Sequence, residues 1–387
     1  MNTWRFCLLN CLLAAGLGCQ GTPCPNTGQG PIAYFTSTPQ AGGSAEEIWL
    51  SMPHPSDHRV NAEGLPDWSD FPDPYRVDLL DDYLDILGSV DGYGLSSPIF
   101  VRFDAPIDTA AIPFQPAATR READRIQLVD ITPDSPEYGR RRPVRWQWWD
   151  SPQTYVPGNT LAVAPAWGFP LSEATTYALI LTDAITGVDG QSIQRPGLLS
   201  TLLEGKDTDS CSGNAVPTAF ETSYEPLRAY LNENPTLKEK VAVATVFTTQ
   251  SLSPALEAIH GSLQNNPPEF NADSWRELGD NGQYWEEKTF KWSGSDTVTY
   301  YLLEGRLTVP NFQVGSVPYD RDGQLNIIEG TPTPVLQEDI RFTLTIPSQG
   351  PHGGASCLPI VEYAHGTTGS AYSMVDSTGG RLAARGI

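Results

Sequence analysis

Apolar positions follow a helical period early in the chain and a strand period further along. Residues 77–87, "VDLLDDYLDIL", place apolar side chains at intervals of three and four, with the aspartates mostly on the other side, which predicts a short amphipathic helix. Residues 53–74 are rich in Pro, Asp and aromatic residues without any period, which is typical of irregular chain. We therefore expect residues 31–89 to be an irregular segment that contains one short helix.

Short strand-like runs follow between residues 90 and 200. They begin at Ile99, are separated by Pro, Gly and Asp turns, and read "PIFVRFD", "IQLVDIT", "PVRWQWWD", "TLAVAP" and "TYALILTDAIT". Strands at such spacing predict a β-sandwich. "PIFVRFDAPIDTAAIP" and the closing "LILTDAITGVDGQSI" resemble the Ig-like domains of bacterial surface proteins. An Ig-like β-sandwich is therefore expected over residues 90–200.

Residues 201–297 mix the two periods. Apolar residues from Val216 to Leu231 keep a helical period, "KVAVATVFTTQS" is typical of a buried strand, and "SPALEAIHGSLQ" of a further helix. We interpret this stretch as a mixed α/β connecting region.

The pattern changes again over residues 298–387. "TYYLLEGRLTVPNF" and "DIRFTLTIPSQ" alternate apolar and polar positions and predict two strands. "CLPIVEYAHG" is more continuously apolar than these two runs and predicts a third strand, of the kind found in sheets that are buried on both faces. "MVDSTGGRLAARGI" is then expected to form a helix and return to a strand.

The composition supports a folded and β-rich protein. Hydrophobic residues make 39% of the 387 residues, which is enough to fill sizeable cores. The 35 Gly and 34 Pro make about 18% of the chain, above an average of about 12%, and this favours short strands joined by turns. The net charge of −22, from 46 acidic and 24 basic residues, argues against nucleic acid and anionic lipid as partners because both require basic patches.

The first 18 residues have the features of a secretory signal peptide, with one Arg, an apolar run over residues 6–17 and a small residue at Gly18. Gly18-Cys19 resembles a bacterial lipobox, whose cysteine is acylated. We therefore expect an exported lipoprotein of the outer membrane or cell surface, anchored through Cys19, with residues 19–30 as a tether. Gly16 stands where the lipobox prefers Leu, so ordinary cleavage and secretion is the alternative.

The remaining cysteines are Cys24, Cys211 and Cys357. Three cysteines in an oxidising compartment form at most one disulfide among themselves. A bond between Cys211 and Cys357 is one pairing, and a partner in another chain is another.

The stretch "VEYAHGTTGS", residues 361–370, resembles the early half of the α/β-hydrolase fold, in which His-Gly and small residues follow the third strand. In that fold this loop supplies one backbone N–H of the oxyanion hole. The resemblance implies that the Thr367 N–H is the donor, with Gly366 and His365 forming the loop. His365 would shape the loop and would not carry the catalytic proton.

The nucleophile motif of that fold, Gly-x-Ser-x-Gly, does not occur in the sequence. In the α/β-hydrolase chain order the serine, the acid and the histidine all follow the oxyanion loop. We therefore expect this chain to lack the catalytic triad. It is either a truncated part of a longer enzyme, which we favour because a three-stranded half sheet leaves an apolar edge open, or a degenerate chain without activity.

A wider resemblance covers most of the chain. The lipobox-like start and the motifs "MPHPSDHRV", "SPIFVRFDAPID", "YEPLRAYL", "ATVFTTQS" and "IVEYAHGTTG" are similar to large secreted bacterial lipases and esterases, including those described as virulence-factor lipases. This resemblance implies an exported serine carboxylic-ester hydrolase that acts on lipid or smaller ester substrates. The alternative is a non-catalytic surface lipoprotein whose Ig-like domain binds a partner.

The expected fold class is thus a β-rich N-terminal region with an Ig-like β-sandwich, followed by the first strands of an incomplete α/β-hydrolase sheet over residues 298–387. We expect neither a metal nor an organic cofactor. Residues 318–329 resemble a calcium loop, but Pro318 stands at the first ligand position, and a hairpin turn is the better interpretation. His54 and His58 are interpreted as surface or turn residues. The oligomeric state does not follow from the sequence.

Overall fold

The computed structural model describes residues 29–36, 43–121, 125–209, 214–279, 282–291, 297–319, 323–348 and 357–387. The chain divides into a first unit, Met1–Ser251, and a second unit, Leu252–Ile387. Several antiparallel sheets make the protein β-rich, which confirms the prediction from composition. The expected signal peptide and the cysteines Cys19, Cys24 and Cys211 lie outside the described residues. No helix among the described residues is long and apolar enough to cross a membrane.

The first unit contains two antiparallel sheets that share one core. Their strand orders are β1-β5-β4 and β3-β2-β6-β7. Val101 and Leu161 of the first sheet and Leu128 and Leu179 of the second lie in the same buried cluster, so the two sheets pack against each other. The strands are β1 (Ile99–Arg102), β2 (Ile126–Asp130), β3 (Arg141–Arg142), β4 (Val144–Trp149), β5 (Thr160–Pro165), β6 (Thr176–Thr182) and β7 (Val241–Thr248).

Strand β7 completes the four-stranded sheet from a distant part of the chain. It pairs with β6 in antiparallel register from Thr176↔Thr248 to Thr182↔Val241. Seven of its eight residues are buried, because the sheet is covered on both faces. The strand itself was predicted, and the structure shows that it belongs to the same sheet as β2 and β6.

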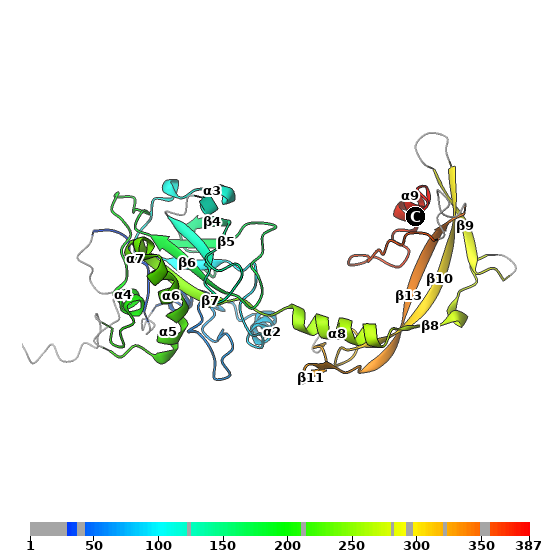
Figure 1. Ribbon diagram of the computed structural model, residues 1–387, viewed down its shortest axis with the longest axis horizontal. Helices are drawn as coiled ribbons and strands as arrows, with labels where there is room; N and C mark the ends of the chain where they lie inside the picture. Colours follow the sequence, from blue (N-terminus) through cyan, green and yellow to red (C-terminus); the bar gives the residue numbers. More distant parts are fainter. Residues whose placement is uncertain are drawn as a thin grey trace, which may run out of the picture. The chain divides into compact units, whose positions relative to one another are not determined.

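Helices cover the second face of this four-stranded sheet (Figure 1). Leu199 and Leu227 of two helices pack against Ile180 and Val246 of the strands. The buried Tyr224 hydroxyl donates to the Ala244 carbonyl at 3.0 Å. The helices of the first unit are α1 (Ala45–Trp49), α2 (Asp78–Leu87), α3 (Pro116–Arg121), α4 (Gly197–Glu204), α5 (Thr218–Ser223), α6 (Glu225–Glu233) and α7 (Pro235–Lys240), with a 3-10 turn at Thr109–Ala111.

Helix α2 forms where the period predicts it, but it buries none of its residues. On the predicted apolar stripe, Val77 and Tyr83 are 40% and 57% exposed, and Leu80 and Leu84 are half-buried. The helical period therefore correctly predicted the helix, whose apolar face is only partly covered within the described residues.

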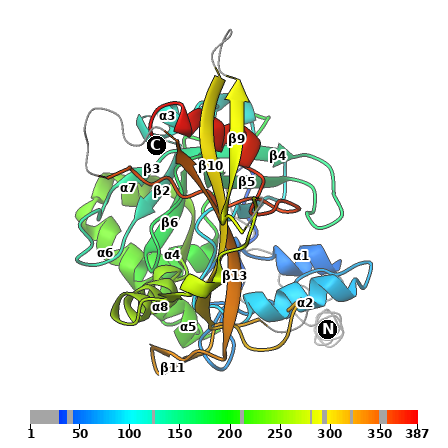
Figure 2. The same ribbon diagram turned by 90° about the vertical axis from the view of Figure 1, so that its right-hand side faces the viewer.

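The second unit is built on two long strands that lie side by side (Figures 1 and 2). β10 (Thr297–Asn311) and β13 (Leu336–Pro347) pair in antiparallel register from Tyr300↔Pro347 to Asn311↔Leu336, as their alternating sequences predict. The remaining elements are α8 (Ser253–Asn265), β8 (Glu269–Phe270), β9 (Trp285–Lys291), β11 (Ile327–Ile328), β12 (Thr331–Pro332), α9 (Gly380–Ala383), a 3-10 turn at Ala272–Ser274 and a π-helical turn at Val375–Gly379.

The predicted third strand over "CLPIVEYAHG" is wrong. Residues 358–366 form no strand, and Ile360 is 89% exposed. The physical reason is that no strand among the described residues pairs with this run, and a β-prone run becomes a strand only when a neighbouring edge takes its N–H and C=O groups. The predicted sheet buried on both faces is therefore not observed in the described part of the second unit.

The predicted helical segment after this run is present in part. The π-helical turn and α9 pack on one face of β10, where Tyr300 and Leu302 meet Val375 and Ala383 in a small core. Gly380 allows this close approach, because a Cβ atom there would lie 2.6 Å from Phe290. The small core means that a few contacts fix residues 371–387.

Candidate functional site

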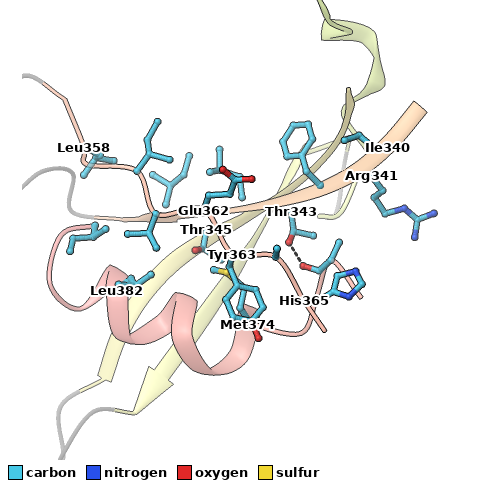
Figure 3. A pocket seen from close by; sticks show the side chains of 18 of the residues that line it. Ile340, Arg341, Thr343, Thr345, Leu358, Glu362, Tyr363, His365, Met374 and Leu382 are labelled. Carbon is cyan, nitrogen blue, oxygen red and sulfur yellow. Dashed lines mark hydrogen bonds between the residues drawn. The ribbon is translucent and has the colours of Figure 1, made fainter. Parts of the chain in front are cut away.

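A groove runs along the free edge of β13. Its volume is about 920 Å³, and it lies between residues 339–347 on one wall and residues 358–365 on the other (Figure 3). Met374, Leu382 and Ile387 close it from the helical segment. The groove is thus lined mainly by apolar side chains, with Arg341, Glu362 and His365 among the polar ones.

The loop predicted from the sequence begins at one end of this groove. His365 lines the groove, and its Nδ1 lies 2.9 Å from the Gly366 carbonyl. Residues 366–369 form a tight turn, closed by the Gly369 N–H donating to the Gly366 carbonyl at 3.0 Å, with Thr368 at φ 66°. A positive φ at the third position is the geometry of a type II turn.

Within the described part of the chain, the N–H of Thr367 has no hydrogen-bond acceptor, and the residue is exposed. A free backbone N–H in a tight turn is a donor that can meet an external oxygen. His365 lines the groove, Gly366 and Thr367 follow it in the turn without lining the groove, and Cys19 lies outside the described residues.

A buried carboxylate fixes the chain just after this loop. Glu304 of β10 is 5% exposed, and its oxygens lie 3.2 Å from Arg276 Nη1 and 3.3 Å from Arg341 Nε. The Tyr372 hydroxyl donates to the same carboxylate. A carboxylate with two cationic partners and a hydroxyl donor is well compensated for its burial. Glu304 therefore holds residue 372, and with it the end of the loop, on the sheet.

Two further hydrogen bonds hold the same segment. The Thr343 hydroxyl donates to the Ala371 carbonyl, drawn as a dashed line in Figure 3. The buried Tyr300 hydroxyl donates to the Val375 carbonyl at 2.9 Å. Burial, with a contribution from Asp376, raises the pKa of Tyr300, so this phenol stays protonated and keeps its donor role. The loop is thus followed by an anchored segment.

The chemistry that the turn beside the groove offers is hydrogen-bond donation. Thr367 presents a backbone N–H, and an N–H placed at a developing negative oxygen stabilises it. The lining residues include no serine or cysteine. Among the described residues, no group of three His, Cys, Asp or Glu side chains is placed to hold a metal ion.

A second polar cluster lies in the first unit, where residues 54–59 cross the edge strand β7. The Asp57 N–H donates to the Val246 carbonyl, and the Asp57 carboxylate accepts from both the N–H and the hydroxyl of Thr248, each at 2.7 Å. The Thr245 hydroxyl donates to the Pro55 carbonyl at 2.7 Å. These contacts tie an irregular segment to an otherwise open strand edge, which protects that edge.

The interpretation of His54 as a surface residue is wrong. His54 is 5% exposed and packs against Trp49, Trp68 and Tyr93. Burial, together with the neighbouring Arg59 charge, lowers its pKa well below the usual value. The proline-rich composition concealed this burial, because irregular chain carries no period that marks an inward face.

Ser56 and His58 form a hydrogen-bonded pair that resembles part of a catalytic dyad. Ser56 Oγ lies 2.6 Å from His58 Nδ1, and the imidazole stacks on Phe220 with ring centroids 3.9 Å apart. Burial, then the charge of Arg59, lowers the pKa of His58 to about 3. Ser56 is fully buried, so a substrate cannot reach its hydroxyl, and the pair is structural.

The sequence predicted the loop that contains residues 365–367 but not the side chains that fix it. Glu304 occupies an inward position of an alternating strand, and a charged residue at such a position was the available signal. Tyr372 carried no such signal, because its partner is remote in sequence.

A scan of the sequence against protein-family models finds no match, and a search among curated proteins finds no similar sequence.

Proposed function

We propose that the chain is the N-terminal part of an exported serine carboxylic-ester hydrolase, in which residues 365–367 form the oxyanion loop. One observation carries the proposal: the exposed Thr367 N–H has no acceptor within the described residues and stands in a turn at the end of an apolar groove. Under this proposal, a further part of the enzyme supplies the nucleophile and its His–acid pair. The proposed substrate is a lipid ester or a smaller carboxylic ester.

The order of elements supports this proposal. Two long antiparallel strands are followed by an extended apolar run, a His-Gly turn and a helical segment. Residues 370–374 separate the turn from the helical segment, which begins at Val375, and the turn itself leaves the Thr367 N–H free to face an anionic oxygen. The anchoring of Ala371, Tyr372 and Val375 limits movement of that turn, and catalysis by fixed dipoles requires such preorganisation.

The test uses the full-length gene product, including the further part that supplies the nucleophile. The protein is purified from its exporting host and assayed with p-nitrophenyl esters of short and long acids. Thr367→Pro removes the N–H, and proline suits this position because it favours the second residue of such a turn. Loss of one oxyanion donor is expected to lower kcat about 10²- to 10³-fold.

Thr367→Ala is the matched control, because it removes the side chain and keeps the N–H. We expect its kcat to stay within a few-fold of the wild-type value. Equal kcat values for Thr367→Pro and Thr367→Ala would contradict the proposed role of this N–H. Absence of ester hydrolysis by the purified gene product would contradict the proposed activity itself.

A second function, a non-catalytic surface protein that binds a partner, is favoured by one observation. The loop between β5 and β6 exposes Trp167 and Phe169, with Trp167 79% exposed. Exposed aromatic side chains are enriched at recognition surfaces. Under this proposal the gene product hydrolyses no ester, and Trp167→Ala weakens binding of the partner by the surface-exposed protein.

Export and lipid anchoring are proposed with either function. The apolar run at residues 6–17 and Cys19 support them. Metabolic labelling with a radioactive fatty acid is expected to mark the wild-type protein and not Cys19→Ser. Release of unlabelled wild-type protein into the medium would instead support ordinary secretion.

A further inference from the structure

Helix α2 leaves part of its apolar face exposed. Leu79 and Ile86 are 61% and 60% exposed, and Tyr83 between them is also exposed. These three residues follow one another at intervals of four and three, so they form one line along the helix, and we call them the α2 stripe. Leu80 and Leu84, on the adjoining side, are half-buried. One side of the apolar face is therefore partly covered, and the α2 stripe is free to contact a partner.

Acidic residues border the α2 stripe. Asp82 lies three positions after Leu79 and four before Ile86, so its carboxylate is a neighbour of both. Asp78 lies one turn earlier on the same side. Within the described residues, none of the four carboxylates of α2 forms an ion pair or accepts a hydrogen bond. Residues 70–91 contain seven Asp and one Arg, so the surface around the stripe is negative.

The carboxylates of α2 also repel one another. Among the four aspartates, every one has another at a distance of three or four positions, and like charges at these spacings destabilise a helix. Asp85 lies in the last turn, where the helix dipole disfavours a negative charge. Cations brought by a partner relieve both effects, so the helix itself favours a basic occupant.

Charge argues against three other occupants. A second copy of this chain would bring the same acidic helix to the contact, and the two sets of carboxylates would repel. Anionic lipid is repelled for the same reason. The parts of this chain outside the described residues contain only two Lys or Arg residues, Arg5 and Arg321, so they supply no basic segment. A partner with clustered positive charge is the occupant that complements this surface.

We propose that the α2 stripe binds a basic amphipathic helix of another polypeptide. Because α2 bonds its own backbone groups, the contact is made by side chains, and apolar residues of the partner pack on Leu79, Tyr83 and Ile86. Lys or Arg side chains of the partner, one turn apart, pair with Asp78 and Asp82. The inference is independent of both proposed functions, and its test measures helix binding alone.

The probe is a fluorescent synthetic peptide of about 14 leucine and lysine residues, in which leucine recurs at intervals of three and four. It is titrated into the full chain and followed by fluorescence anisotropy. We expect saturable binding and slowed hydrogen exchange in residues 78–87. A peptide of the same composition in scrambled order keeps the charge and loses the apolar face, and its affinity is expected to be at least about tenfold lower. Equal affinity of the two peptides, or no saturable binding, would overturn the proposal.

Two leucine variants locate the site. Leu79→Ala shortens a side chain of the stripe and keeps a good helix former, and it is expected to weaken peptide binding about tenfold. Leu256→Ala is the matched control, because Leu256 is 63% exposed on helix α8 and lies outside the α2 stripe. The affinity of this control is expected to stay unchanged. Equal losses in the two variants would show that the peptide does not bind at α2.

A second pair of variants tests the charge. Asp82→Asn is expected to lower the affinity about threefold at low salt, and by less in about 0.5 M salt, which screens exposed ion pairs. Glu257→Gln on α8 makes the same change in net charge away from the stripe and is expected to have no such effect. Equal effects of the two variants would contradict the pairing with Asp82.

Two further results would assign the α2 stripe to a different occupant. A dimer of the full chain in light scattering that Leu79→Ala dissociates would overturn the proposal in favour of a second copy. Sedimentation of the wild-type protein with phosphatidylcholine vesicles, lost in Leu79→Ala, would overturn it in favour of a lipid surface.

Discussion

Asp57, which is buried beside β7, makes the free energy of unfolding depend on pH. Burial raises the pKa of Asp57 from 3.8 to about 6, although two hydrogen bonds from Thr248 oppose the shift. The folded protein therefore holds this proton more tightly than the unfolded chain does. The contribution of Asp57 to the free energy of unfolding is fully present below about pH 4 and is lost as the pH rises through about 6.

The magnitude follows from the size of the pKa difference. A shift of about two units at about 1.4 kcal/mol per unit gives roughly 2–3 kcal/mol of stability lost between pH 4 and pH 7. Asp57→Asn mimics the protonated acid: its amide oxygen still accepts from the Thr248 N–H, and its NH₂ group can donate to the Thr248 hydroxyl. The variant is expected to lack this part of the pH dependence.

Urea unfolding of the full chain at pH 4 to 8, followed by tryptophan fluorescence and by hydrogen exchange of β7 peptides, measures the effect. The difference in unfolding free energy between Asp57→Asn and wild type is expected to rise by about 2–3 kcal/mol in favour of the variant across this range. Other titrating groups cancel in the difference. Parallel pH curves for the two proteins, or a difference that falls with pH, would show that Asp57 does not titrate in this way.

Three further substitutions, two of them with a matched control, test the packing inside each unit. Leu179→Ala in the fully buried core of the first unit is expected to cost about 2–5 kcal/mol in urea unfolding, whereas Val188→Ala, at an exposed site, should change stability by less than about 0.5 kcal/mol. Gly380→Ala places a Cβ atom 2.6 Å from Phe290 and should destabilise the second unit by about 1–3 kcal/mol. Its control is Gly261→Ala in α8, whose added Cβ meets no atom within 4 Å and should be neutral or stabilising. Equal effects of the two substitutions would contradict the close packing of Gly380. Tyr300→Phe removes the bond to the Val375 carbonyl and should speed hydrogen exchange in residues 371–387 by about tenfold; unchanged exchange would show that this bond does not hold the segment.

The sequence predicted those elements whose pattern of apolar and polar residues matches the burial of their own side chains. Strands β2, β6 and β7 are runs of buried residues, and β10 and β13 alternate, so each matched one template. The run at 358–364 matched a strand template equally well and is not a strand. Its conformation depends on a neighbouring edge, which its own residues do not encode.

The side chains that position the candidate loop could be predicted only in part. The His-Gly turn at residues 365–366 is a local pattern, and its exposed N–H at Thr367 follows from the turn. Glu304 acts through Arg276, Arg341 and Tyr372, which come from three separate segments. Such a set forms only when the strands have paired, so no spacing in the sequence indicates it.

The proposal that residues 365–367 belong to a serine ester hydrolase can be tested by direct labelling of its nucleophile. The purified gene product is treated with a fluorophosphonate, and the labelled peptide is identified by mass spectrometry. We expect one serine to be modified and ester hydrolysis to be lost in proportion to labelling. An unlabelled protein that hydrolyses no ester would contradict the proposal and leave partner binding as the function to pursue.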